Sequence, residues 1–254
     1  MTTVSKKCIS LAQNIIFVFL VIYLMSAAVF IENDIVLSKL WRTSSLNSPI
    51  FNKRQAFIVI SQSAFTPGLR SIMADFMHVK LHDAWHEGRW FRIIPYVESI
   101  LILQPEWLDG WEIGAWHMST NIPSAISGSP FLTKEDKKKE INIWMKKAEN
   151  LLKSGCIINN DSYRLFFYLG WFYFFNIEDY DNAILYFEKA KKRPDHDWHV
   201  ERLIAHTYKK KGEKKKALKM FRALLADESY HNNSETKMKS LKNNISSLEK
   251  ELFQ

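Results

Sequence analysis

The chain has 254 residues, of which 47% are hydrophobic and 24% are charged, and it contains only 8 Gly and 7 Pro. This composition excludes disorder, collagen-like repeats and a loop-rich β fold, and two cysteines without CxxC spacing exclude a disulfide framework and a zinc knuckle. The formal net charge of +8 comes from the C-terminal part, because residues 189–254 hold 17 Lys and Arg against 9 Asp and Glu, while the other residues hold 18 of each.

The first predicted element is an uncharged apolar segment at residues 15–31, which we interpret as a transmembrane signal anchor. As a helix it would reach about 26 Å, close to the thickness of the hydrocarbon core of a bilayer. Two lysines precede it and two carboxylates follow it, so the positive-inside rule places residues 1–14 in the cytoplasm and the rest outside. The alternatives are a signal peptide cleaved near residues 26–28 and a buried core helix.

The remainder of the chain reads as a connector, a helical array and a final helix. Residues 32–66 form the connector, and in residues 67–228 apolar positions follow a helical period, with Gly or Pro recurring at a spacing typical of solenoids. Residues 119–134 are rich in turn formers and read as an inserted loop. In residues 229–254, an apolar stripe predicts a helix that caps the last repeat, formed by Met238, Leu241, Ile245, Leu248 and Leu252. We therefore expect an all-α fold with about four helical pairs.

One unit of this array has a specific residue pattern. It runs from residue 161 to residue 194 and carries small, aromatic and helix-ending residues at set positions, namely Leu169, Gly170, Tyr173, Tyr180, Ala183, Phe187, Ala190 and Pro194. The pattern resembles the tetratricopeptide repeat (TPR) family, with one residue inserted at 176–179. The resemblance implies that Gly170 and Ala183 let two helices approach closely and that Phe187 fills the space between them. The next unit repeats the pattern with Ala205, Tyr208, Gly212, Ala217 and Phe221.

The stretches at residues 68–75 and 114–121 are similar to a group of membrane-anchored bacterial TPR proteins without an agreed activity. This resemblance implies a single pass through the bacterial inner (cytoplasmic) membrane, with the repeats in the periplasm. It also implies partner binding rather than a reaction. No nucleophile elbow, phosphate-binding loop or dinucleotide motif is present, and Cys156 reads as part of an exposed turn without a base. We therefore expect neither an enzyme nor a cofactor.

In the repeat family, the first helix of each pair lines a concave groove. The offsets implied by the resemblance place a protein partner, as a peptide or a subunit, against Asp75, His78, His82, Trp85, Trp111, Met118, Arg164, Phe167, Trp171, His199, Arg202, His206 and Lys209. The same offsets also select Phe174, Phe175 and Lys210. The alternative is that some of these aromatic residues belong to the core, because an inserted residue rotates the following helix by about 100°.

Two other binding functions remain open. His78, His82 and His86 recur every fourth residue after Asp75, so with His117 from a neighbouring helix they are metal-ligand candidates; neutral histidines lining the groove, or a pH sensor, are the alternatives. The six lysines within Lys209–Lys216 are candidates for contact with anionic lipid, and nucleic acid is an unlikely partner. The chain is also a candidate for a permanent accessory subunit of a membrane complex.

Overall fold

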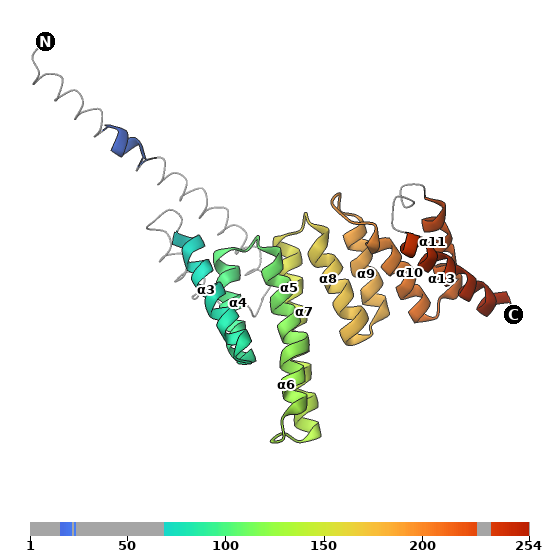
Figure 1. Cartoon of the computed structure of the whole chain (residues 1–254), viewed down its shortest axis with the longest axis horizontal. Helices are drawn as coiled ribbons and strands as arrows, with labels where there is room; N and C mark the ends of the chain where they lie inside the picture. The colour runs from blue at the N-terminus through green and yellow to red at the C-terminus, as the bar shows by residue number, and fades with distance from the viewer. Residues whose placement is uncertain (1–15, 22, 24–68, 228–234, 254) are drawn as a thin grey trace, which may run out of the picture. The chain divides into compact units, whose positions relative to one another are not determined.

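A computed structural model describes residues 16–21, 23, 69–227 and 235–253 of the chain. Every regular element in these ranges is helical, which is the predicted all-α class (Figure 1). The chain divides into two compact units, the first ending at Trp107 and the second beginning at Leu108.

The N-terminal predictions fall largely outside the described residues. Only residues 16–21 and 23 of the predicted anchor are described, and they are helical. Residues 1–14 and the connector at 32–66 lie outside the described ranges. Among the residues that the structure does describe, no helix combines the length and the apolar character needed to cross a membrane.

The described part of the first unit is one helical pair, α3 (Leu69–His86) and α4 (Trp90–Leu103). A short turn joins the two helices at Gly88, whose φ of +65° is a conformation that favours glycine. The helices pack through small and branched side chains, including Ala74 and Ala84 on α3 and Ile93 on α4, all nearly or fully buried. It is the first helical pair of the described residues.

The second unit contains the remaining helices, and neighbours in the sequence pack against one another, α8 on α9, α10 on α11 and α11 on α13 (Figure 1). Two of the elements are single π-helical turns, η1 and η2. The elements are α5 (Leu108–Trp116), η1 (His117–Asn121), α6 (Ile122–Gly128), α7 (Lys134–Ile158), α8 (Tyr163–Phe172), η2 (Tyr173–Ile177), α9 (Tyr180–Lys191), α10 (His199–Lys211), α11 (Lys214–Ala226) and α13 (Glu235–Phe253).

The α8–α9 pair shows why the repeat needs a glycine. A Cβ atom at Gly170 would lie only 2.6 Å from Cδ1 of Phe187, so a larger residue there would push the two helices apart. Phe187 and Ala183 on α9 are both fully buried. The close approach predicted for these residues from the resemblance to the repeat family is therefore present in the structure.

The last helix, α13, caps the array as predicted. Leu241, Ile245 and Leu248 join the core formed with α10 and α11, and Met238 and Leu252 pack at its edge. Because these five residues follow a helical period, one face of α13 covers the apolar side of α11 while the opposite face stays polar.

The predicted loop insertion at residues 119–134 is mostly helical instead. The π-helical turn η1 continues directly into α6, and only residues 129–133 form a turn before α7 begins. Ile122, Pro123 and Ile126 are buried on α6, and a proline is tolerated in the first turn of a helix because its missing N–H has no partner there. The prediction counted turn-forming residues and missed this buried apolar side.

The prediction for Cys156 is also wrong. The residue belongs to α7 and is only 6% exposed, and burial raises the pKa of its thiol to about 12. The neighbouring Gly155 explains the difference, since a Cβ atom there would lie 2.9 Å from Leu165 and 3.0 Å from Trp111. Gly155 therefore lies inside α7, at the point where this helix packs closely against α5 and α8, and not in a turn.

Candidate functional site

A row of aromatic side chains runs along one side of α8 into η2. Tyr163, Phe167, Trp171 and Phe175 follow one another at every fourth residue, and the ring centroids of consecutive members lie 6.3, 6.2 and 4.2 Å apart. Trp171 is 37% exposed and Phe175 is 53% exposed, while Leu165 on the opposite side of α8 is fully buried. We call these four residues the aromatic row.

The π-helical turn η2 absorbs the residue inserted in this repeat. Its widened backbone closes with a hydrogen bond of 3.0 Å from the amide of Asp179 to the carbonyl of Tyr173, and Glu178 takes a left-handed conformation with φ of 58°. Tyr173 consequently faces the core, where its hydroxyl donates to Glu149 at 2.7 Å. Phe174 is half-buried and Phe175 is exposed, so the insertion leaves the end of the aromatic row at the surface.

Helix α10 supplies the opposite side of the site. The His199 ring meets the ring of Phe167 edge-on, with centroids 4.6 Å apart, which joins α10 to the aromatic row. One turn further along, the guanidinium carbon of Arg202 lies 5.0 Å from the centre of the Trp198 ring. Lys209 donates from Nζ to Oδ1 of Asn244 on α13 at 3.1 Å. Aromatic side chains of α8 and α10 thus converge with cationic side chains of α10, and α13 adds an amide.

The aromatic row ends in a pocket of about 600 Å³. Aromatic and aliphatic side chains come from η2 and α10, and charged side chains come from the C-terminal end of α10, from α11 and from α13. The lining residues are Phe174, Phe175, Leu203, His206, Lys209, Lys210, Lys214 and Glu251. Burial, together with the positive charges of Arg202 and Lys209, lowers the pKa of His206 to about 4, so its imidazole is neutral at pH 7.

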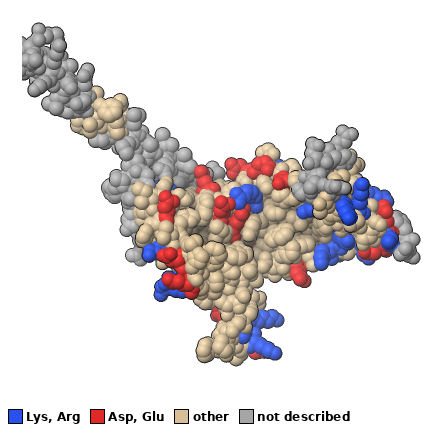
Figure 2. All heavy atoms as spheres, viewed as in Figure 1, with Lys and Arg blue, Asp and Glu red and all other residues tan. Residues whose placement is uncertain are grey.

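Positive charge dominates this end of the second unit, where Lys and Arg gather over α10, α11 and α13 (Figure 2). Some of these cations are neutralised, since Lys214 pairs with Glu251 at 2.9 Å and Lys211 pairs with Asp181 at 2.7 Å. Within the described ranges, no carboxylate pairs with Lys209, Lys210 or Arg202. The pocket lining therefore has an excess of positive charge, three lysines against Glu251, beside exposed aromatic rings.

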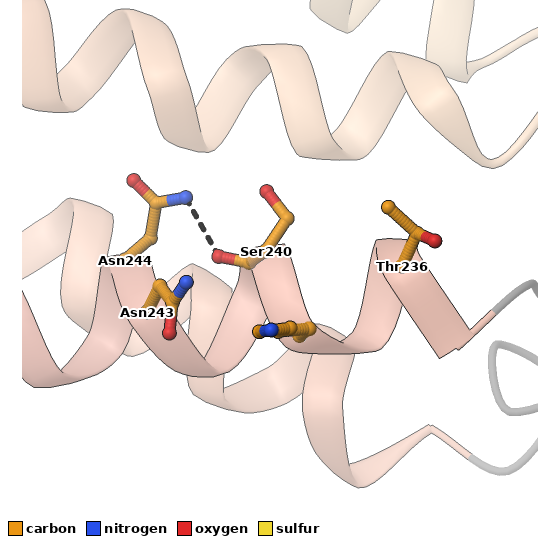
Figure 3. A pocket seen from close by; sticks show the side chains of 5 residues that line it. Thr236, Ser240, Asn243 and Asn244 are labelled. Atoms are coloured by element: carbon orange, nitrogen blue, oxygen red, sulfur yellow. Dashed lines mark hydrogen bonds between the residues drawn. The ribbon is translucent and has the colours of Figure 1, made fainter.

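A second hollow, of about 340 Å³, lies along α13 and was not predicted. Its lining is polar and comes from α13, with Thr236, Ser240 and Asn244 projecting from the same side of the helix (Figure 3). Lys239 and Asn243 complete the lining. The hydrogen bond between Lys209 and Asn244 connects this hollow to the first pocket. The spacing of these polar residues was visible in the sequence, but α13 was interpreted as a cap alone.

Arg164 was predicted to meet a partner, but it holds α8 to α5. Its guanidinium donates to Glu112 through Nε at 3.1 Å and through Nη2 at 2.8 Å, and to Asp109 at 2.6 Å. Such a two-point bond to one carboxylate fixes both side chains in orientation. The cation is thus already neutralised within the protein, and because its side chain is still 39% exposed, its contact with a partner stays a prediction.

Trp111 and Met118 are corrected, because they are 0% and 1% exposed and cannot line an open groove. Trp111 lies against Gly155 of α7, where the absence of a side chain leaves room for the indole ring. The long helix α7 therefore covers the side of α5 that the repeat offsets place in the groove. The aromatic surface begins at α8.

The remaining predicted residues belong to the first unit. Asp75, His82 and Trp85 are exposed on α3, and the ring of His78 lies 4.1 Å from that of Trp107, where burial lowers the pKa of His78 despite the opposing charge of Asp75. In the second unit His117 is buried, and its Nδ1 lies 2.8 Å from the amide of Asn121. Among the described residues, no group of three or more His, Cys, Asp and Glu side chains could hold a metal ion.

Comparison with solved structures gives a match among TPR proteins. No family model matches the chain, and no curated protein matches its sequence. A crystal structure described as a thermophilic TPR protein from Thermus thermophilus matches with 14% sequence identity and a TM-score of 0.44, covering 77% of this chain and 97% of that protein. The helical pairs described above define the fold independently of this match.

Proposed function

We propose that the chain is a membrane-tethered adaptor that binds a segment of a protein partner on the face formed by α8, η2 and α10. The observation that carries the proposal is the aromatic row, which ends beside an excess of cations in a pocket of about 600 Å³. A soluble fold gains stability by burying such rings, so the neighbouring exposed rings of Trp171 and Phe175 mark a surface that another molecule covers.

The chemistry of the pocket defines the segment that it suits. Trp171 and Phe175 present ring faces on which an aromatic or branched side chain can pack, and large rings commonly supply most of the binding energy at interfaces. Lys209 and Lys210 can neutralise a carboxylate of the same segment. The neutral ring of His206 offers one hydrogen-bond donor and one acceptor between these two regions. A segment with an apolar anchor followed by an acidic group therefore satisfies each region.

The membrane part of this proposal comes from the sequence of residues 15–31. With that segment as a signal anchor in the bacterial inner membrane, the helical array lies in the periplasm and meets exported or membrane-bound partners. A lipid role for the Lys209–Lys216 cluster has less support, because Lys211, Lys214 and Lys216 all pair with carboxylates of the protein. We therefore assign the pocket to an acidic segment of a protein and not to lipid headgroups.

A permanent accessory subunit of a membrane complex would use the same face. In that case the aromatic row would be covered throughout the life of the protein, whereas an adaptor would exchange its partner. Size-exclusion chromatography of the full chain after mild detergent extraction distinguishes the two. A stable complex of fixed stoichiometry indicates a subunit, and a monomer that binds added partner indicates an adaptor.

The test begins by identifying what contacts the row. A photoreactive amino acid is placed at Phe175 in the full-length chain in its native membrane, and a matched control is placed at Leu185 on α9, which is 47% exposed. We expect one partner to be crosslinked from position 175 and not from position 185. The crosslinked segment of that partner is then synthesised for binding measurements.

Binding of the synthetic segment to the purified full chain gives the decisive measurement. We expect Trp171→Ala to weaken binding by at least about tenfold, as for an interface hot spot. Lys210→Glu should also weaken it, more strongly at low salt, and Leu185→Ala should have no effect. Unchanged affinity in both Trp171→Ala and Lys210→Glu would show that the partner does not use this face.

A further inference from the structure

Two histidines near the C-terminal end of α3 have ring nitrogens that face each other. Nε2 of His82 and Nε2 of His86 lie 3.0 Å apart, and the ring centroids are separated by 4.2 Å. Both side chains are exposed, so the space beside the two nitrogens is open to solvent. This pair lies in the first unit and plays no part in the proposed peptide site.

The separation of the two nitrogens corresponds to a particular coordination geometry. Two imidazole nitrogens bound to one ion at about 2.0–2.1 Å and at right angles lie about 3.0 Å apart, whereas a tetrahedral angle separates them by about 3.4 Å. The observed 3.0 Å is the length of the hydrogen bond that joins the two rings, and it is closer to the right-angle separation than to the tetrahedral one. Cu²⁺ and Ni²⁺ favour the right angle with nitrogen ligands, and Zn²⁺ in proteins favours the tetrahedron.

We propose that His82 and His86 form a binding site for a divalent transition-metal ion of square or tetragonal geometry, with Cu²⁺ preferred. Cu²⁺ stands above the other divalent ions of its row in affinity for nitrogen ligands. The two Nε2 atoms occupy adjacent coordination positions, and water occupies the others. In the metal-free pair one Nε2 carries the proton of the hydrogen bond, and this ring adopts the Nδ1–H tautomer when both Nε2 atoms bind the ion.

The helix holds the two rings in place and favours a cation there. Leu81 and Ala84 are buried on the inner side of α3. Their packing fixes the rotation of the helix about its axis, and the two histidines therefore stay on its outer side. The chain then turns at Gly88, with hydrogen bonds from Gly88 N to Trp85 O at 3.0 Å and from Arg89 N to Ala84 O at 2.8 Å. The site therefore lies at the C-terminal end of α3. The negative end of the helix dipole is located there, and it stabilises positive charge.

The site uses two of the four histidines that the sequence offered as metal-ligand candidates. His78 contacts Trp107 through its ring, and His117 belongs to the other unit, where it pairs with Asn121. Two protein ligands and open positions make a site that exchanges its ion with solvent, in contrast to a closed structural site. Reversible metal uptake at the first unit is the expected behaviour.

The experiment titrates CuCl₂, and separately ZnCl₂, into the purified full chain in detergent, with calorimetry and electron paramagnetic resonance as readouts. We expect one Cu²⁺ site with two nitrogen ligands from imidazole and a weaker affinity for Zn²⁺. His82→Ala and His86→Ala should each weaken Cu²⁺ binding by more than about tenfold, because loss of even a supporting residue commonly costs that much.

His78→Ala is the matched control, since it removes a histidine from the same helix without touching the pair. We expect it to retain the affinity and the two-nitrogen signal. The absence of saturable Cu²⁺ binding, a signal that survives in His82→Ala or His86→Ala, or an equal loss in His78→Ala would each overturn the proposal. Because both proposed ligands are exposed, circular dichroism should show the same helix content in all variants.

Discussion

Helices α5 and α8 each carry a tryptophan that the repeat offsets place in the groove, yet the two residues have opposite environments. Trp111 of α5 is fully buried beside Gly155, whereas Trp171 of α8 is 37% exposed beside Phe175. The difference comes from what packs against each ring, because α7 closes over Trp111 at Gly155, whereas the rings next to Trp171 belong to its own α8–η2 segment. A ring becomes available to a partner only where no neighbouring helix covers it.

Replacing the two tryptophans gives the sharpest test of this contrast. Trp111→Ala should lower the free energy of unfolding by about 3–5 kcal/mol, because it leaves a cavity in a closed core. Trp171→Ala should lower it by less than about 2 kcal/mol, because the ring is already partly hydrated. Denaturant unfolding of the full chain in detergent measures both. Equal losses would show that Trp171 belongs to the core as well.

A substitution at Gly170 tests the close contact between α8 and α9 behind the aromatic row. Gly170→Ala should lower the free energy of unfolding by about 1–3 kcal/mol, because its Cβ atom would overlap the buried ring of Phe187. Gly128→Ala is the control, since no atom lies within 4 Å of its added Cβ. That substitution should leave stability unchanged or raise it by about 0.4–1 kcal/mol. A tolerated Gly170→Ala would contradict the tight α8–α9 packing.

Low pH should destabilise the fold through two histidines, His117 directly after α5 and His206 on α10 beside the aromatic row. Burial lowers the pKa of His117 to about 4, and burial with the charges of Arg202 and Lys209 does the same for His206. In the unfolded chain these groups take up a proton near pH 6.5. Between pH 6.5 and 4 the unfolded state therefore binds more protons, and stability falls as the pH falls, by on the order of 1 kcal/mol for each histidine.

Unfolding measurements at pH 7 and pH 4.5 check this dependence, with His117→Gln and His206→Gln as variants. Each variant should lose part of the acid sensitivity. Partner binding should affect the two histidines differently. An acidic segment in the pocket raises the pKa of His206 and leaves that of His117 unaltered. If partner binding leaves the contribution of His206 to the pH dependence of unfolding unchanged, the acidic group of the partner binds elsewhere.

The smallest expected effect concerns the ion pair that joins α5 and α8. Arg164→Ala should lower the free energy of unfolding by about 0.5–1 kcal/mol, because the pairs are partly exposed but bind one carboxylate at two points. Arg222→Ala breaks the more exposed pair with Glu249 and should have a smaller effect. Thermal unfolding at low and high salt compares the two. A loss of partner binding in Arg164→Ala without a loss of stability would place this residue in the groove.

Sequence patterns predicted the helix pairs well where two neighbouring helices determine the packing. The spacing of Gly170, Ala183 and Phe187 depends only on α8 and α9, and the stripe from Met238 to Leu252 depends only on the side of α13 that meets α10 and α11. Prediction was poorer between residues 117 and 133, where a buried side was hidden by many turn-forming residues. There the period of the apolar residues was a better guide than composition.

The site was predicted in part. Phe167, Trp171, His199, His206 and Lys209 do lie near one another across α8 and α10, although their role in partner binding stays a prediction. Fixed repeat offsets failed at α5, because they take no account of the close approach that Gly155 allows between α7 and Trp111. They also said nothing about the polar side of α13, which lines the second hollow.

The sequence by itself determined that this chain forms paired helices, because periodic burial and close contact are properties of residues a few positions apart. Only the tertiary structure decided which rings and cations stay available. Trp111 and Arg164 meet their partners across 44 and 52 residues of chain, at Gly155 and Glu112 respectively. The solvent exposure of a side chain depends on such neighbours, which are distant in the sequence, and a pattern of nearby residues cannot predict it.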